Sequence, residues 1–270
     1  MVVQHNLSAM NTSRQMGSVS SAMSKSTEKL SSGYRINRAG DDAAGLSISE
    51  KMRSQIRGLN KASDNAQDGI SLIQVAEGAL NETHSILQRM NELATQAAND
   101  TNTLVDRQSI KDEIKQLNEE LDRISSTTQF NKQDLLTGGF SGKLQVGALE
   151  GQTMDVKISL AVSAKGLNVS AVEVSTNAKA GAAMQSIQDA IESVSKQRSK
   201  LGAIQNRLEH TINNLDTNAE NTQAAESRIR DTDMADEMVQ YSKNNILSQA
   251  GQSMLTQANQ QTQGVLSLLQ

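Results

Sequence analysis

Apolar residues recur every seven positions through most of the chain, and no other feature limits the possible folds as strongly. The longest uninterrupted series lies in the first half of the chain: Met52, Leu59, Ala66, Ile73, Leu80, Leu87 and Ala94. This interval places the side chains along one face of a helix and is typical of helices that pack against partner helices. The chain contains no proline. Because proline breaks helix interiors, its absence agrees with long, uninterrupted helices.

The same spacing predicts several helices separated by short breaks. The expected helices cover residues 2–30, 42–98, a segment around 110–124, 179–229 and 234–269. An unbroken helix over the second of these ranges would be roughly 85 Å long at ~1.5 Å per residue. Such lengths favour a rod over a globule.

Between about 139 and 178 the helical spacing gives way to alternation among clustered glycines. The alternating apolar positions are Met154, Val156, Ile158, Leu160 and Val162, with Val172 and Val174 continuing the pattern. A period of two is typical of strands, so a small β-hairpin region is expected here. It is too short to build a core of its own.

Together these patterns predict a mainly α fold: a long antiparallel coiled-coil helical rod with paired terminal helices and a small β-hairpin region near the middle of the chain. Three parts are expected. Residues 1–41 form the N-terminal half of a terminal helical domain, 42–230 form the rod with its β region at about 139–178, and 231–270 form the C-terminal half.

The charges of the two ends also favour their pairing. Residues 1–40 hold five basic groups and one acid, a net charge of +4, whereas residues 231–270 hold four acids and one base, a net charge of −3. Opposite charges on facing helices favour association and help to set register. Both ends are rich in Ser, Asn, Thr and Gln, and isolated helices of this quality are marginal in water. We therefore expect both ends to become ordered when neighbouring subunits cover them.

Composition argues against several classes of protein. The chain has two Tyr, two Phe and no Trp, which suits thin helical bundles better than a thick core. Without cysteine it cannot form a disulfide or a thiolate metal site. The net charge of −4 gives no reason to expect nucleic-acid binding. No apolar run approaches the ~20 residues of a membrane span, and the N-terminal segment lacks the features of a Sec-type signal peptide.

No catalytic or metal-binding constellation can be assembled from the sequence. His5, His84 and His210 stand alone in expected helices, and no H-E-x-x-H, nucleophile-elbow or phosphate-loop motif is present. The acidic run DTDMADE at 231–237 lacks the glycine turn and final Glu of a calcium-binding EF-hand loop. Acids that cap a helix start explain the run more simply. We expect no enzymatic activity, no cofactor and no metal.

Two long segments resemble the signatures of bacterial flagellins. They are LSSGYRINRAGDDAAGLSISEKMRSQIRGLNKASDNAQDGISLIQVAEGAL at 30–80 and SRIRDTDMADEMVQYSKNNILSQAGQSMLTQANQQTQGVLSLLQ at 227–270. QRMNELATQAAND at 88–100 and TQFNKQDLLTG at 128–138 are similar to the same family. The likeness covers about 1–138 and 180–270. The variable outer domains of many relatives are essentially absent, and only 139–178 stands in their place.

This resemblance implies an exported, extracellular subunit that polymerises through its terminal helices into the bacterial flagellar filament for motility. Export would use the flagellar type III apparatus, with an export chaperone bound to the C-terminal segment 231–270. Further partners implied are other flagellin subunits, the filament cap and the hook-junction proteins. The residues expected to act in filament assembly are Val2, Leu7, Met16, Met23, Leu30, Leu247, Met254, Leu255, Val265 and Leu268.

The resemblance also implies recognition by Toll-like receptor 5 of vertebrate hosts. The receptor-contacting positions of the family map onto Arg89, Leu93 and Glu113. Arg89 and Leu93 are four residues apart and share one helical face, as a docking surface requires. The alternative is that Arg89 is a solvated charge and Leu93 is half-buried packing.

Two other functions remain possible from the sequence. A hook–filament junction protein of the flagellum shares the design of the terminal helices, although such proteins carry weaker forms of the 30–80 signature. A secreted ligand whose main role is to engage a host receptor is the other.

Overall fold

The computed structural model describes residues 6–267 of the chain, and side chains as far as residue 261. In that span the chain forms five helices and two small antiparallel sheets. The helices are α1 (Leu7–Ser32), α2 (Ala43–Ala97), α3 (Leu104–Thr127), α4 (Asn177–Arg230) and α5 (Met234–Ser267). The strands are β1 (Gln129–Phe130), β2 (Gln133–Asp134), β3 (Phe140–Gln145) and β4 (Thr153–Ile158). The prediction of a mainly α fold with a small β region is confirmed.

The chain divides into two compact units. The first contains residues up to Ser54 and from Asn221 onward, and the second contains Gln55–Glu220. Both α2 and α4 therefore contribute one end to the first unit and the remainder to the second. The boundaries expected from the sequence, 41/42 and 230/231, lie at helix ends, whereas the compact units divide inside α2 and α4.

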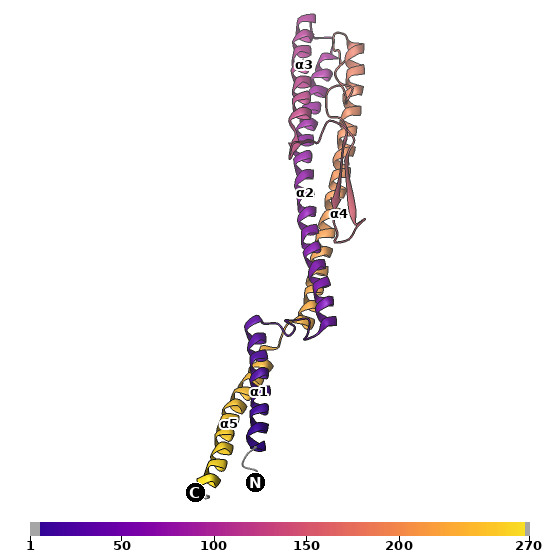
Figure 1. The fold of residues 1–270 in the computed structure, drawn as a ribbon. Coiled ribbons are helices and arrows are strands. Elements are labelled where there is room, and N and C mark those ends of the chain that lie inside the picture. Colours follow the sequence, from indigo (N-terminus) through magenta and orange to yellow (C-terminus); the bar gives the residue numbers. More distant parts are fainter. Residues whose placement is uncertain (1–5, 268–270) are drawn as a thin grey trace. The chain divides into compact units, whose positions relative to one another are not determined.

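In the first unit, α1 and α5 lie side by side (Figure 1). Asn6 begins α1, because its side chain accepts a 3.0 Å hydrogen bond from the Ala9 amide. Gly33 ends it with a φ of 75° and donates its N–H to the Lys29 carbonyl, a conformation that glycine adopts without strain. At the start of α5, Asp233 accepts hydrogen bonds from the amides of Ala235 and Asp236. The capping role predicted for the acidic run is confirmed at Asp233.

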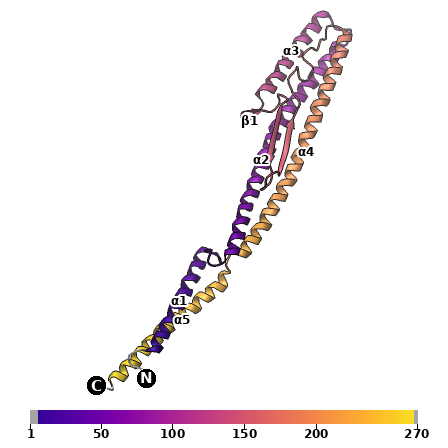
Figure 2. The same cartoon turned by 45° about the vertical axis from the view of Figure 1, so that its right-hand side comes forward.

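In the second unit, α2, α3 and α4 pack around a large apolar core, with the β3–β4 hairpin against α2 and α4 (Figure 2). A smaller apolar cluster contains Leu59, Ala62, Leu215 and Ala219. Six of the seven residues in the series predicted from the sequence are buried here: Leu59, Ala66, Ile73, Leu80, Leu87 and Ala94. The seventh, Met52, lies in the first unit and is half-buried. The counterparts of this series on α4 are Ile187, Val194, Leu201, Leu208 and Leu215, all buried. Arg198 lies 3.8 Å from Glu77, and the Asn177 side chain donates to the Ala98 carbonyl. The two contacts are 21 residues apart on each helix, so they share one antiparallel register.

The middle of the chain departs from the prediction after residue 158. Met154, Val156 and Ile158 alternate inward on β4 as expected. Val172 and Val174, predicted to continue the strand pattern, lie instead in an irregular segment, so that part of the prediction was wrong. Side chains of α3 hold this segment: Asp122 accepts the Ala164 amide at 2.8 Å and Asn118 donates to the Val169 carbonyl at 3.3 Å. These bonds replace a strand ladder.

The short β1–β2 hairpin was not predicted. Its turn residues, Asn131 and Lys132, have φ values of 49° and 62°. Positive φ at both central positions is the mark of a type I′ turn, which matches the twist of paired strands. The sequence marks this turn only by Asn131, and the residues on either side of it do not alternate clearly between apolar and polar.

Candidate functional site

The contact between α1 and α5 is a narrow seam of regularly spaced residues. On α5 the side chains in the seam alternate by four and three: Glu237, Tyr241, Asn244, Ser248, Gly251, Leu255 and Ala258. On α1 the matching series is Ala9, Thr12, Met16, Val19, Met23, Ser26 and Leu30. This spacing is that of a coiled coil. Four residues expected to act in assembly, Met16, Met23, Leu30 and Leu255, therefore lie in the seam and are half-buried.

The α5 side of the seam is mostly small or polar, whereas α1 contributes Met16, Val19, Met23 and Leu30. Two polar contacts set the register of the pair. The side-chain Nδ2 of Asn6 donates to the Ala258 carbonyl at 2.9 Å. Toward the other end, Lys29 lies 3.5 Å from Glu237. Small seam residues let the two helices approach closely, but they bury little apolar surface, and burial of apolar surface is the main stabilising term.

The remaining assembly residues lie outside the seam or outside the described part of the chain. Leu7 is 72% exposed, Leu247 is 45% exposed and Met254 is 62% exposed. Leu247 and Met254 lie beside the stripe of α5 that meets α1, which runs through Gly251 and Leu255. Val2 and Leu268 lie outside the described residues, and so does the side chain of Val265.

Large apolar side chains consequently face solvent along both terminal helices. They are Leu7 and Met10 on α1, and Met234, Met238, Val239, Ile246, Leu247 and Met254 on α5. Scattered exposed apolar residues are ordinary, but eight large ones on one pair of helices favour contact with other chains. We call this set the terminal apolar surface.

A short backbone bridge in the first unit joins the segment after α1 to the segment between α4 and α5. The Arg35 amide donates to the Arg230 carbonyl at 2.7 Å, and the Thr232 amide donates to the Gly33 carbonyl at 3.0 Å. These bonds form a one-residue antiparallel bridge between Tyr34 and Asp231. Sequence reasoning missed this bridge, because nothing local marks two chain segments almost 200 residues apart as partners.

The residues expected to contact a receptor lie in the second unit. The Arg89 guanidinium donates to the Glu113 carboxylate at 2.9 and 3.0 Å and to Glu92 at 3.2 Å. The hydrogen bond to Glu113 is the largest cause that raises the pKa of Arg89, followed by the bond to Glu92. The structure thus brings Arg89 and Glu113 together on the surface. Leu93 is 2% exposed and packs in the core.

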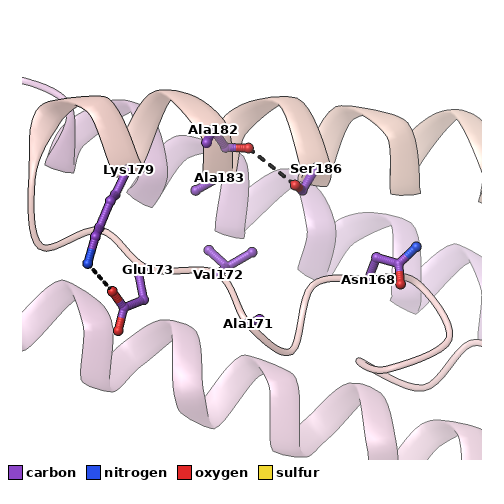
Figure 3. A pocket seen from close by; sticks show the side chains of 8 residues that line it. All are labelled: Asn168, Ala171, Val172, Glu173, Lys179, Ala182, Ala183 and Ser186. Carbon is purple, nitrogen blue, oxygen red and sulfur yellow. Dashed lines mark hydrogen bonds and ion pairs between the residues drawn. The ribbon is translucent and has the colours of Figure 1, made fainter.

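A hollow of about 360 Å³ lies between α4 and the irregular segment before it (Figure 3). Glu173 and Lys179 form an ion pair at its edge, and Lys111 lies 3.6 Å from the same carboxylate. The bond from Lys179, followed by the charges of both lysines, lowers the pKa of Glu173. The hydroxyl of Ser186 donates to the Ala182 carbonyl. It therefore faces no base that would make it a nucleophile.

Residues 6–267 contain no candidate metal site and no candidate membrane span. No group of three or more His, Asp or Glu side chains there could hold a metal ion. His84 pairs with Gln88 at 3.0 Å. None of the described helices combines the length and apolar character needed to cross a membrane.

Comparison with known proteins gives full-length matches. The family model of the bacterial flagellin N-terminal helical region matches residues 3–141, and that of the C-terminal helical region matches residues 184–269. A flagellin of Halalkalibacterium halodurans is 56% identical over 271 residues, covering 100% of both chains. The crystal structure of Bacillus cereus flagellin is 34% identical with a TM-score of 0.51, covering 60% of this chain and 94% of that one.

A structure of a putative flagellar hook-associated protein from Vibrio parahaemolyticus also matches. It has a TM-score of 0.62 at 16% identity and covers 71% of this chain and 100% of that one. At this identity the likeness concerns the fold alone.

The long helices and the terminal apolar surface define a helix-rich structural protein that assembles with other chains. The two family models and the full-length relative go further, and the chain belongs to the bacterial flagellin family. It is therefore a structural component of the flagellar filament, and the resemblance seen in the sequence is confirmed.

Proposed function

We propose that this chain is exported and polymerises through α1 and α5 into the flagellar filament. The observation that carries the proposal is the terminal apolar surface. Eight large apolar side chains of α1 and α5 are at least 45% exposed, while the α5 side of the seam is mostly small or polar. Neighbouring subunits would cover that surface and supply the apolar burial that the seam lacks.

Charge on the same helices supports contact between copies. Arg14 and Lys25 are exposed on α1, and Asp236 is exposed on α5 beside Asp233. Among the described residues no ion pair involves these four groups. Opposite charges on separate helices favour pairing between subunits and help to fix orientation.

The test is assembly of purified monomer in ammonium sulfate, a salt that strengthens apolar burial. Electron microscopy should show long uniform filaments from the full chain. A chain lacking 231–270 should give none, and a chain with Leu104→Ala, an exposed apolar residue of the second unit, should assemble normally. Compact particles from the full chain would refute the proposal.

The further partners follow from the family. An export chaperone would bind 231–270, where α5 exposes most of the terminal apolar surface, and the filament cap and the hook-junction proteins would meet the growing and basal ends. Mixing the monomer with the export chaperone of the same bacterium should give a soluble complex that the 231–270 deletion abolishes. A complex that survives the deletion would place the chaperone elsewhere.

Recognition by Toll-like receptor 5 is proposed for the surface around Arg89 and Glu113. Both side chains are about half exposed, at 51% and 45%, and their ion pair forms a preorganised polar contact. Leu93 is 2% exposed, so its role would be to hold α2 in place. Arg89→Ala should weaken activation of receptor-bearing reporter cells at least tenfold.

Arg123→Ala is the matched control for that experiment. Arg123 also forms an exposed ion pair, with Glu120 on α3, and its loss should leave activation unchanged. Equal losses of activation in both variants would show that general destabilisation, and not the loss of a receptor contact, weakens activation.

The alternative function is that of a hook–filament junction protein. The fold is shared with a putative hook-associated protein, so fold does not separate the two functions. Antibody labelling of flagella would separate them. Labelling along the whole filament is expected here, whereas labelling confined to a zone beside the hook would favour the alternative.

A further inference from the structure

An apolar groove lies between α1 and α5 at the seam position that lacks a side chain. Its volume is about 360 Å³, and its apolar lining comes from Met16 and Val19 on α1 and from Leu247, Gly251 and Met254 on α5. A Cβ atom added to Gly251 would lie 3.8 Å from Cγ of Met16, an ordinary van der Waals distance. A methyl group therefore fits there, and most of the groove would stay open beyond it.

The α5 side of this groove is apolar and faces solvent, whereas α1 also contributes the polar side chains of Asn11, Thr12 and Gln15. Leu247 and Met254 lie on one side of the groove and are 45% and 62% exposed. Water in contact with apolar walls on several sides is unfavourable, so such a groove favours an apolar occupant.

The opposite face of α5 carries side chains of suitable shape. Val239 and Ile246 are seven residues apart and are 65% and 67% exposed. Ile246 is five residues from Tyr241 and five from Gly251, which places it about 140° around the helix from both seam residues at ~100° per residue. Val239 and Ile246 therefore form a short apolar row that points away from α1.

We propose that the groove beside Gly251 receives the row of Val239 and Ile246 from a second copy of this chain. The proposal rests on the proposed polymerisation and adds which two surfaces meet. The groove and the row lie on different faces of the terminal pair, so the contact is heterologous. Heterologous contacts that do not close generate open helical filaments rather than dimers.

Charge favours a second copy as the occupant. The contact would bring the acidic start of α5 from one subunit, with Asp233 and Asp236, toward α1 of the next, which exposes Arg14 and Lys25. The attraction would operate between copies, because the described ion pairs within one chain do not use these groups.

Substitution at Gly251 tests the groove directly. Gly251→Leu keeps the helix and fills the groove, whereas Gly251→Ala adds only the methyl group that fits beside Met16. Monomers of each variant are added to sheared wild-type filaments, and the critical concentration for elongation is measured by sedimentation. The Leu variant should raise it at least about tenfold, and the Ala variant by less than about twofold. Circular dichroism and size-exclusion chromatography of the monomers should show unchanged helix content and size.

A second variant tests the row and its pairing with the groove. Ile246→Ala alone should raise the critical concentration. The double variant, Ile246→Ala with Gly251→Leu, should raise the critical concentration over that of the wild type by less than the product of the two single fold-changes. Coupling of this kind is expected only for surfaces that meet. A simple product of the two effects would overturn the pairing.

The outcomes separate this inference from the proposed function. If wild-type monomers fail to elongate the filaments, the polymerisation proposal itself fails. If wild-type and Gly251→Leu monomers elongate them equally well, polymerisation stands and the groove proposal is overturned. Loss of export-chaperone binding in Gly251→Leu, with normal elongation, would assign the groove to the chaperone and overturn the inference as well.

Discussion

The guanidinium carbon of Arg230 lies 5.0 Å from the centroid of the Tyr34 ring. A guanidinium nitrogen of the same side chain lies 2.6 Å from the Glu50 carboxylate. Arg230 thus stacks on the segment that follows α1 while it pairs with the first turns of α2. Its side chain is 12% exposed. Arg230 therefore holds the end of α4 against both the segment after α1 and the start of α2.

Removal of Arg230 should loosen this junction. Arg230→Ala is expected to lower the free energy of unfolding of the first unit by about 2 kcal/mol, because it removes a cation–π contact and a charged hydrogen bond. Hydrogen exchange of the Arg35 and Thr232 amides should accelerate. Arg228→Ala, an exposed arginine one half-turn earlier, is the control and should leave both amides protected. Equal acceleration in the two variants would contradict the role given to Arg230.

The start of α3 should respond to acid through its capping box. The Asp106 carboxylate accepts the Thr103 hydroxyl at 2.7 Å and the Thr103 amide at 2.9 Å. These bonds, the hydroxyl first, lower the pKa of Asp106 below its ordinary 3.8. A lowered folded-state pKa means that the carboxylate stabilises the helix start above the ordinary pKa, and that this stability is lost as the pH falls through the folded value.

An NMR titration of the Thr103 amide would check the pH dependence. The amide shift should follow the lowered pKa of Asp106 in the native chain, and the step should be missing in Asp106→Asn. A native midpoint at or above the ordinary aspartate value would refute the capping role.

Two glycines of α2 should respond oppositely to alanine. No atom lies within 4 Å of a Cβ added to Gly78, whereas a Cβ on Gly58 would lie 2.8 Å from Cβ of Ala148 in the β3–β4 turn. Gly78→Ala should stabilise the second unit by about 0.5–1 kcal/mol through helix propensity. Gly58→Ala should destabilise it, because the turn must shift. Urea unfolding of both variants measures the difference, and stabilisation by both would show that the turn moves freely.

Truncation of a core side chain should destabilise the second unit strongly, whereas truncation of an exposed side chain at the start of α3 should not. Leu87 is fully buried, and Leu87→Ala should cost about 2–5 kcal/mol through lost burial and the cavity left behind. Leu104, which is 80% exposed, should change stability by less than about 0.5 kcal/mol when truncated. Thermal unfolding of the two variants provides the comparison, and equal losses would contradict the burial of Leu87.

The rod could be predicted well because its pattern is local. The series from Leu59 to Ala94 and its α4 counterparts all lie inside, since a seven-residue repeat leaves a long helix one stripe to bury. The irregular segment after β4 could not be predicted in the same way. Val172 and Val174 alternate like strand residues, but whether a neighbouring strand exists to pair with them depends on remote parts of the chain.

The residues proposed to contact a receptor show the same limit on a smaller scale. Arg89 and Leu93 share a helical face by spacing, yet the Arg89 side chain is 51% exposed and Leu93 is 2% exposed. Leu93 lies in the core shared by the three helices, whereas Arg89 stays at the surface and pairs with Glu113 of α3. Spacing defines a face, whereas burial depends on where the partner helix lies.

The sequence by itself determined the helices, their breaks and the apolar stripes that must finally be buried, because backbone propensity and side-chain period act over a few residues. Only the tertiary structure decided which stripe meets which partner. On α5 the small and polar row through Gly251 faces α1, since small side chains allow close approach and Asn6 and Lys29 hold that register. The larger apolar row remains on the surface, because the chain alone offers it nothing to pack against.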